Sequence, residues 1–100
     1  DPAKVREAFY PNAKITGYIG TGLAEMSVDD FASFVESQQP SPKDKQEEIL
    51  LEILSCELAG STACVRVRDG YIGNVYLDTL SFLKKDGEWK IYNKLFHIES

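Results

Sequence analysis

The chain has 100 residues, of which 43% are hydrophobic and 27% are charged, and its formal net charge is −5 at pH 7. This length and composition predict one folded domain that spans residues 1–100. The negative charge argues against nucleic acid as a partner, because proteins that bind a phosphate backbone cluster their Lys and Arg residues. No apolar run approaches the roughly 20 residues of a membrane span, so no membrane partner is predicted either.

The first segment, DPAKVREAFYP, predicts a short helix. Asp1 can cap it and Pro2 suits its first turn, while Pro11 ends it because the residue before a proline avoids the helical region. A short strand, Lys14 to Ile19, and a turn are expected next. The nearby glycines lack the Lys-Ser/Thr pair of a phosphate-binding loop, so we assign them to the strand and the turn.

A second helix is expected to begin at Ser27. Ser27 can act as its cap together with Asp30, and acidic residues suit the positive end of a helix dipole. The predicted buried stripe of this helix consists of Val28, Phe31, Phe34 and Val35. Residues 38–46, QQPSPKDKQ, contain two prolines and predict an exposed loop.

Residues 47–58, EEILLEILSCEL, fit either a helix or a strand. Propensity favours a helix, because Glu and Leu are good helix formers. The turn AGST and the alternating segment ACVRVRDGYI that follow favour a strand, because a hairpin gives both segments a partner. We therefore predict a strand. In VRVR, alternation places Arg66 and Arg68 together on one face, which we assign to solvent.

The two cysteines, Cys56 and Cys64, lie on either side of that turn. A three-residue loop at Ala59–Ser61 places them opposite each other, whereas a two-residue turn at Gly60-Ser61 places Cys56 opposite Val65 and prevents a disulfide. We predict two free thiols, as is typical of a reducing compartment, and hence a cytoplasmic protein. With His97 as the sole histidine, the sequence holds no recognisable zinc set, and we predict no metal and no cofactor.

The segment DTLSFLKKDGEWKIYNKLFHIES predicts a final hairpin. A three-residue loop, Lys85 to Gly87, would pair Asp78 with Lys94 across the strands, whereas a two-residue Asp-Gly turn would set Trp89 against Lys84. We prefer the first register. Around the charged pair it places four large side chains on the same face: Tyr76, Leu80, Tyr92 and Phe96.

A carboxylate and an ammonium among aromatic residues have two interpretations. They can form a partly exposed cross-strand pair, or they can form the floor of a pocket that orients a small ligand. The preferred register also gives the opposite face of the sheet an apolar surface that a second chain would cover. That surface consists of Leu77, Leu83, Trp89, Ile91 and Leu95.

Three segments, FYPNAKITGY, SVDDFASFV and DTLSFLKKDGEWKIYNKLF, resemble the Putative lumazine-binding family. This family belongs to the superfamily of nuclear transport factor 2, ketosteroid isomerase and SnoaL-like proteins. The resemblance implies an α+β fold in which a cone-shaped, strongly curved antiparallel sheet wraps around helices, and a homodimer formed through the sheet. The first long helix of the family has no counterpart in this sequence.

The resemblance also implies roles for single residues. Asp78 matches the strand aspartate of the family and falls where ketosteroid isomerases have the protonated aspartate of their oxyanion hole. Phe96 falls near an aromatic residue of the isomerase pocket, and Asn93 and Lys94 match an Asn-Lys pair of the family. Tyr10 stands where the family commonly has histidine. The general base and the catalytic tyrosine of the isomerases have no counterpart here.

From these observations we expect a protein that binds a hydrophobic or aromatic small molecule. One alternative is an acid–base enzyme of the isomerase, dehydratase or cyclase type that acts on a hydrophobic cyclic substrate. Asp78 is then the candidate catalytic residue, and Tyr76 or Tyr92 donates hydrogen bonds. Another alternative is a protein-interaction module. The predicted pocket residues are Phe9, Tyr76, Asp78, Leu80, Tyr92, Lys94 and Phe96.

Overall fold

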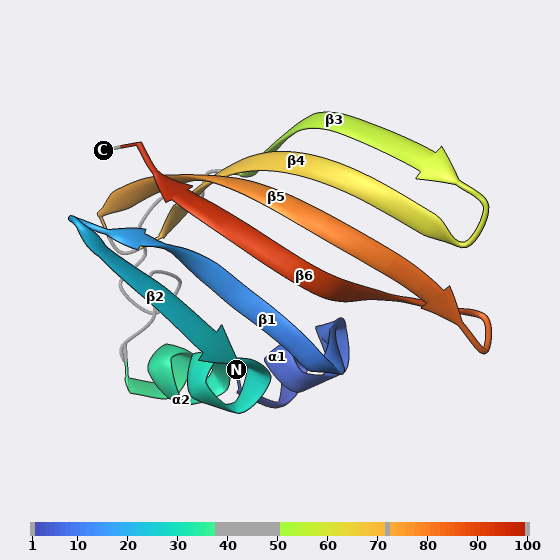
Figure 1. The fold of residues 1–100 in the computed structure, drawn as a ribbon, viewed down its shortest axis with the longest axis horizontal. Coiled ribbons are helices and arrows are strands. Elements are labelled where there is room, and N and C mark those ends of the chain that lie inside the picture. The colour runs from blue at the N-terminus through green and yellow to red at the C-terminus, as the bar shows by residue number, and fades with distance from the viewer. Residues whose placement is uncertain (1, 38–50, 72, 100) are drawn as a thin grey trace.

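A computed structural model describes residues 2–37, 51–71 and 73–99 and shows one curved, open sheet with two helices (Figure 1). The strand order is β2-β1-β6-β5-β4-β3, and all neighbouring strands are antiparallel except β1 and β6, which are parallel. The predicted α+β fold with a curved sheet is therefore confirmed. The elements are α1 (Pro2–Ala8), β1 (Phe9–Ile19), β2 (Gly22–Ser27), α2 (Val28–Ser37), β3 (Leu51–Ala59), β4 (Thr62–Tyr71), β5 (Asn74–Lys85) and β6 (Glu88–Ile98).

The helix α2 begins with the predicted capping box. The backbone N–H of Asp30 donates to Ser27 Oγ at 3.1 Å, and the backbone N–H of Ser27 donates to Asp30 Oδ2 at 3.3 Å. The cap predicted at Asp1 lies outside the described residues. Neither helix of the described segments has the length and apolarity needed to cross a membrane.

The two helices cover one half of the sheet. They pack on β1, β2 and β6, below the sheet in the view of Figure 1. A buried cluster of Phe9, Ala13, Ile15 and Val28 lies in this layer, and the rings of Phe9 and Phe31 meet edge to face at 5.8 Å. The strands β3 and β4 extend beyond the helices, so the core occupies one end of the sheet.

The segment whose sequence fits either a helix or a strand is a strand from Leu51 onward. Residues 47–50 and the loop predicted at residues 38–46 lie outside the described residues. β3 and β4 are joined through the two-residue turn, with Gly60 at φ 59°. Cys56 therefore pairs with Val65, and Cys64 with Glu57, which places the two free thiols on opposite faces of the sheet.

The last hairpin uses the two-residue turn, so the preferred three-residue loop was wrong. Asp86 and Gly87 have φ angles of 54° and 81°, as a type I′ turn requires, and Trp89 lies opposite Lys84. Further along β6, Tyr92 forms a bulge, because Phe82 pairs with Ile91 whereas Ser81 pairs with Asn93.

The bulge changes the partners of the charged residues but preserves their shared face. Asp78 lies opposite Phe96, and Lys94 lies opposite Leu80, so the direct pairing predicted for Asp78 and Lys94 was wrong. The two-residue turn shifts the pairing by one residue relative to the predicted three-residue loop, and the bulge at Tyr92 shifts it by one more. Side chains beyond the bulge therefore return to the faces that were predicted for them. The two charged residues are therefore diagonal neighbours on the inner face, which the helices cover.

The same register corrects the predicted outer surface. Between the turn and the bulge, Trp89 and Ile91 lie on the inner face, because they pair with Lys84 and Phe82, and Ile91 packs against the buried core. Leu77, Leu83 and Leu95 remain on the outer face. The apolar surface predicted from all five residues is therefore divided between the two sides of the sheet.

Gly17 allows a close approach that shapes the inner face. A Cβ atom at this position would overlap the carbonyl oxygen of Phe96 and would lie 2.6 Å from a carbon of its ring. The ring of Phe96 therefore lies directly against the backbone of β1. At Gly22, on the neighbouring strand, a Cβ atom would meet only a carbonyl oxygen at 3.7 Å, an ordinary contact.

We expect Gly17→Ala to destabilise the fold by about 1–3 kcal/mol, because the added methyl group must displace Phe96 or the backbone beside it. Chemical denaturation measures the loss. The matched substitution Gly22→Ala should change stability by less than about 0.5 kcal/mol. Equal stability of the two variants would contradict the close packing of Phe96 on β1.

Candidate functional site

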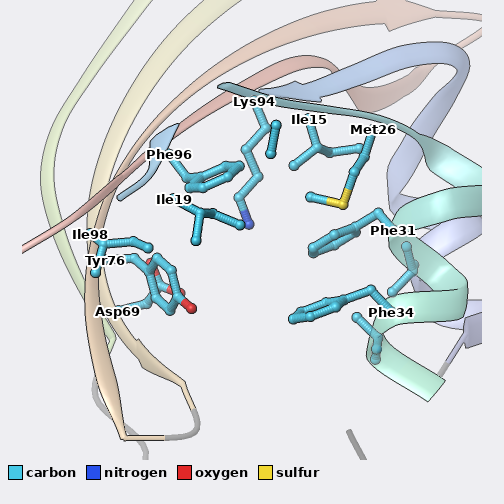
Figure 2. Close-up of a pocket in the computed structure, with 13 residues that line it drawn as sticks. Ile15, Ile19, Met26, Phe31, Phe34, Asp69, Tyr76, Lys94, Phe96 and Ile98 are labelled. Carbon is cyan, nitrogen blue, oxygen red and sulfur yellow. The ribbon is translucent and has the colours of Figure 1, made fainter. Parts of the chain in front are cut away.

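A cavity of about 350 Å³ lies between α2 and the inner face of the sheet (Figure 2). Four aromatic side chains, two polar groups and several aliphatic ones surround it. The cavity is lined by Val5, Ile15, Ile19, Ala24, Met26, Phe31, Phe34, Val35, Asp69, Tyr76, Lys94, Phe96 and Ile98.

The aromatic walls come from two elements that face each other. Phe31 and Phe34 project from α2, three residues apart and therefore on the same side of the helix, toward Phe96 and Tyr76 of the sheet (Figure 2). Phe34 was predicted to be buried, but it is 41% exposed. It lines the cavity instead of filling the core, so much of its ring is accessible from the cavity side.

Lys94 carries a positive charge into this apolar space. Its Nζ lies 3.6 Å from Asp78 Oδ2 and 4.9 Å from the centre of the Phe31 ring. The side chains of Lys94 and Asp78 are only 18% and 4% exposed, so this is a largely desolvated ion pair. The ammonium is thus held between a buried carboxylate and an aromatic face.

Asp69 of β4 is the second carboxyl group of the site. It lies opposite Tyr76 in the sheet and lines the cavity. Burial, hydrogen bonding to Asp78 and the negative charge of Asp78 raise the pKa of Asp69 to about 7, although Lys94 acts in the opposite direction. Asp69 therefore exchanges a proton near neutral pH, unlike an ordinary aspartate.

Each of the two carboxyl groups has one oxygen atom without a partner among the described residues. Oδ1 of Asp69 and Oδ1 of Asp78 are both buried, and neither accepts a hydrogen bond from any described residue. Buried acceptors without a donor are costly, and pairs of carboxyl groups at close range commonly retain a proton.

The structure divides the predicted pocket residues among four locations. Tyr76, Lys94 and Phe96 line the cavity. Asp78 and Leu80 share the inner face but do not line the cavity: Asp78 contacts Asp69 and Lys94, and Leu80 lies opposite Lys94.

The other two predicted residues lie elsewhere. Phe9 is part of the buried core. Tyr92 sits in the bulge, where its ring packs 5.5 Å from that of Tyr10. The bulge accounts for this change, because it takes Tyr92 out of the alternating pattern of β6.

Sequence reasoning missed Asp69, although the signal was present. The alternation that places Arg66 and Arg68 on the outer face places Val65, Val67 and Asp69 together on the inner one. A carboxylate that shares the inner face of a strand with two valines is a candidate for burial. No group of three potential metal ligands occurs within the described segments.

The sequence of the chain matches a known protein family and a curated protein. Residues 1–97 match the family described as Putative lumazine-binding. Among curated proteins, the chain is 24% identical over 94 residues to "Aldolase FrzH" of Cladobotryum sp., covering 94% of this chain and 73% of that protein.

Solved structures share the fold over nearly the whole chain. An NTF-2 like protein of unknown function from Silicibacter pomeroyi has a TM-score of 0.90 at 24% identity, covering 99% of this chain and 80% of that one. An NTF2-like protein of unknown function from Methylobacillus flagellatus has a TM-score of 0.85 at 28% identity, covering 99% of this chain and 77% of that one. The chain belongs to the Putative lumazine-binding family and has the fold of NTF2-like proteins.

Proposed function

We propose that this protein binds a small, largely apolar ring compound in the cavity between α2 and the sheet. The observation that carries the proposal is the composition of the cavity wall. Aromatic and aliphatic side chains form most of it, while Asp69 and Lys94 supply polar groups. Small-molecule sites commonly combine an apolar lining with a few placed polar groups that fix orientation.

The size and the shape of the cavity also support this proposal. A volume of about 350 Å³ is near the lower end of the range for ligand pockets, and it suits a compound of two or three fused rings. The rings of Phe31 and Phe34 face those of Phe96 and Tyr76 across this space. A flat ligand between them would contact aromatic faces on both sides. The name of the family also points to a small heterocyclic ligand.

We expect Phe34→Ala to weaken the binding of 1-naphthalenemethanol, an uncharged two-ring probe, by about three- to tenfold, because an aromatic contact is lost. Quenching of the probe's fluorescence or calorimetry at pH 6 measures the affinity. Leu23→Ala removes another exposed apolar side chain, next to the cavity residue Ala24 but not itself in the lining, and should leave the affinity unchanged. Equal loss in both variants, or none in either, would place the probe outside this cavity.

Acid–base catalysis on a hydrophobic cyclic substrate is a second candidate function. The observation that favours it is the raised pKa of Asp69, which places a carboxyl group that exchanges protons near pH 7 at the cavity wall. The aldolase name of the relative from Cladobotryum sp. is compatible with such chemistry. In this function Asp69, rather than the more deeply buried Asp78, would exchange protons with the substrate. Turnover that depends on pH around 7 and disappears in Asp69→Asn would distinguish it from simple binding.

We also propose that the protein forms a homodimer. The helices leave the inner face of β3 uncovered within the described residues, and Leu51, Ile53 and Leu58 there are 68%, 67% and 70% exposed. Leu58 also lines a shallow groove together with Phe82 of β5. An exposed apolar surface on an edge strand favours association, and a second copy of this chain would bury it.

We expect the protein to sediment as a dimer at tens of micromolar and Leu58→Lys to sediment as a monomer, because the charge would be desolvated in the interface. Leu95→Lys introduces the same charge on the outer face of β6, where Leu95 is 51% exposed, and should leave the dimer intact. The reverse result would place the interface on the outer face. A monomeric parent protein would contradict the dimer itself.

A further inference from the structure

Each of the two carboxyl groups beside the cavity has one oxygen atom without a hydrogen-bond partner. Oδ1 of Asp69 and Oδ1 of Asp78 are buried and have no donor among the described residues, while Asp78 Oδ2 faces the ammonium of Lys94 at 3.6 Å. Asp69 and Asp78 are diagonal neighbours on the inner face of β4 and β5, and a hydrogen bond between their side chains contributes to the raised pKa of Asp69. Two carboxylates cannot donate to each other, so this contact is favourable only when one of them carries a proton. A single proton turns one carboxyl group into a hydrogen-bond donor for the other.

We propose that Asp69 holds a proton at neutral pH and shares it with the carboxylate of Asp78 through a hydrogen bond, and that this proton makes the cavity a site for an uncharged ring compound. This inference rests on the proposed ligand-binding function and specifies its ligand class. With the proton in place, the pair carries one negative charge, and Lys94 balances it. The polar end of the cavity is then neutral as a whole, although it still offers hydrogen-bonding groups.

Among the described residues around the cavity, no other charge balances a second carboxylate. Among the described residues that line the cavity, the titratable ones are Asp69 of β4, Tyr76 of β5 and Lys94 of β6. The lining residues from α1, α2, β1 and β2 are all apolar. The neighbour of Asp69 on β3 is Leu51, which is also apolar. The arginines of β4 lie on the outer face, where Arg68 pairs with Glu52 and Glu99.

Loss of the shared proton would therefore change the ligand that the cavity accepts. The site would then have two carboxylates and one ammonium, which is a net charge of −1 in an apolar space. An uncharged ligand would have to displace the water that solvates the second carboxylate, which costs free energy. A cationic ligand of the same shape would instead supply the missing positive charge.

Two probes of similar shape test this directly: 1-naphthalenemethanol, which is uncharged, and 1-naphthalenemethylamine, which is cationic at both pH 6 and pH 8. With the pKa of Asp69 at about 7, the ionised fraction of the pair rises about tenfold between these two pH values. We expect the alcohol to bind up to about tenfold more weakly at pH 8 than at pH 6. The amine should bind up to about tenfold more tightly.

Variants of either carboxyl group should remove both pH dependences. In Asp69→Asn and in Asp78→Asn, one carboxylate remains to balance the charge of Lys94, so the site stays neutral from pH 6 to pH 8. Each variant should bind the alcohol equally well at both pH values and should show no gain for the amine. Asp86→Asn alters a carboxyl group in the β5–β6 turn, distant in the sheet from the cavity, and should retain the pH dependence of the parent protein.

The possible results distinguish failure of the shared proton from failure of the ligand-binding function. If both probes bind and neither affinity changes with pH, or if Asp69→Asn retains the change, the shared proton is wrong while the ligand-binding function stands. If neither probe binds at either pH, the proposed ligand-binding function is contradicted and the inference fails with it. Opposite pH trends for the two probes that both vanish in the two carboxyl variants support the proposal.

Discussion

The buried carboxylate of Asp78 is the constraint on which the site depends. A carboxylate that is almost completely removed from water is unfavourable unless opposite charge and hydrogen bonds compensate it. Lys94 supplies the charge, and its ammonium reaches Asp78 across the cavity wall while it lies over Phe31. Asp69 interacts with Asp78 from the neighbouring strand β4. The polar end of the cavity is thus a consequence of how one inward-facing carboxylate is accommodated.

This arrangement requires local irregularity in an otherwise regular sheet. The tight Asp86-Gly87 turn alone would place Lys94 on the outer face, and the bulge at Tyr92 returns it to the inner one. Bulges are frequent beside functional sites because they redirect side chains. Gly17 of β1 also shapes the site, because the absence of a side chain there lets the ring of Phe96 lie against the backbone of β1.

The sequence predicted two helices, the β3–β4 and β5–β6 hairpins and the shared face of Asp78 and Lys94, because capping residues, turn residues and alternation are local signals. The end of the first helix at Pro11 was wrong, because α1 ends at Ala8 and β1 already begins at Phe9. The register of the last hairpin was not predictable from alternation, since the turn and the bulge each shift it by one residue and their effects on side-chain direction cancel. β2 and the parallel pairing of β1 with β6 also escaped prediction, because long-range pairing has no local signal. Asp69 was missed because the two arginines that precede it, Arg66 and Arg68, suggested a solvated strand face, although alternation places Asp69 on the other face.

With its pKa raised to about 7, Asp69 retains a proton that ordinary aspartates lose well below neutral pH. The most direct measurement is a carbon NMR titration of the protein labelled at its aspartate carboxyl carbons, between pH 3 and pH 9. We predict one carboxyl resonance that titrates near pH 7, as the pKa of Asp69 requires, and that is absent from the spectrum of Asp69→Asn. A titration in which every aspartate of the parent protein is fully ionised by pH 5 would contradict the account.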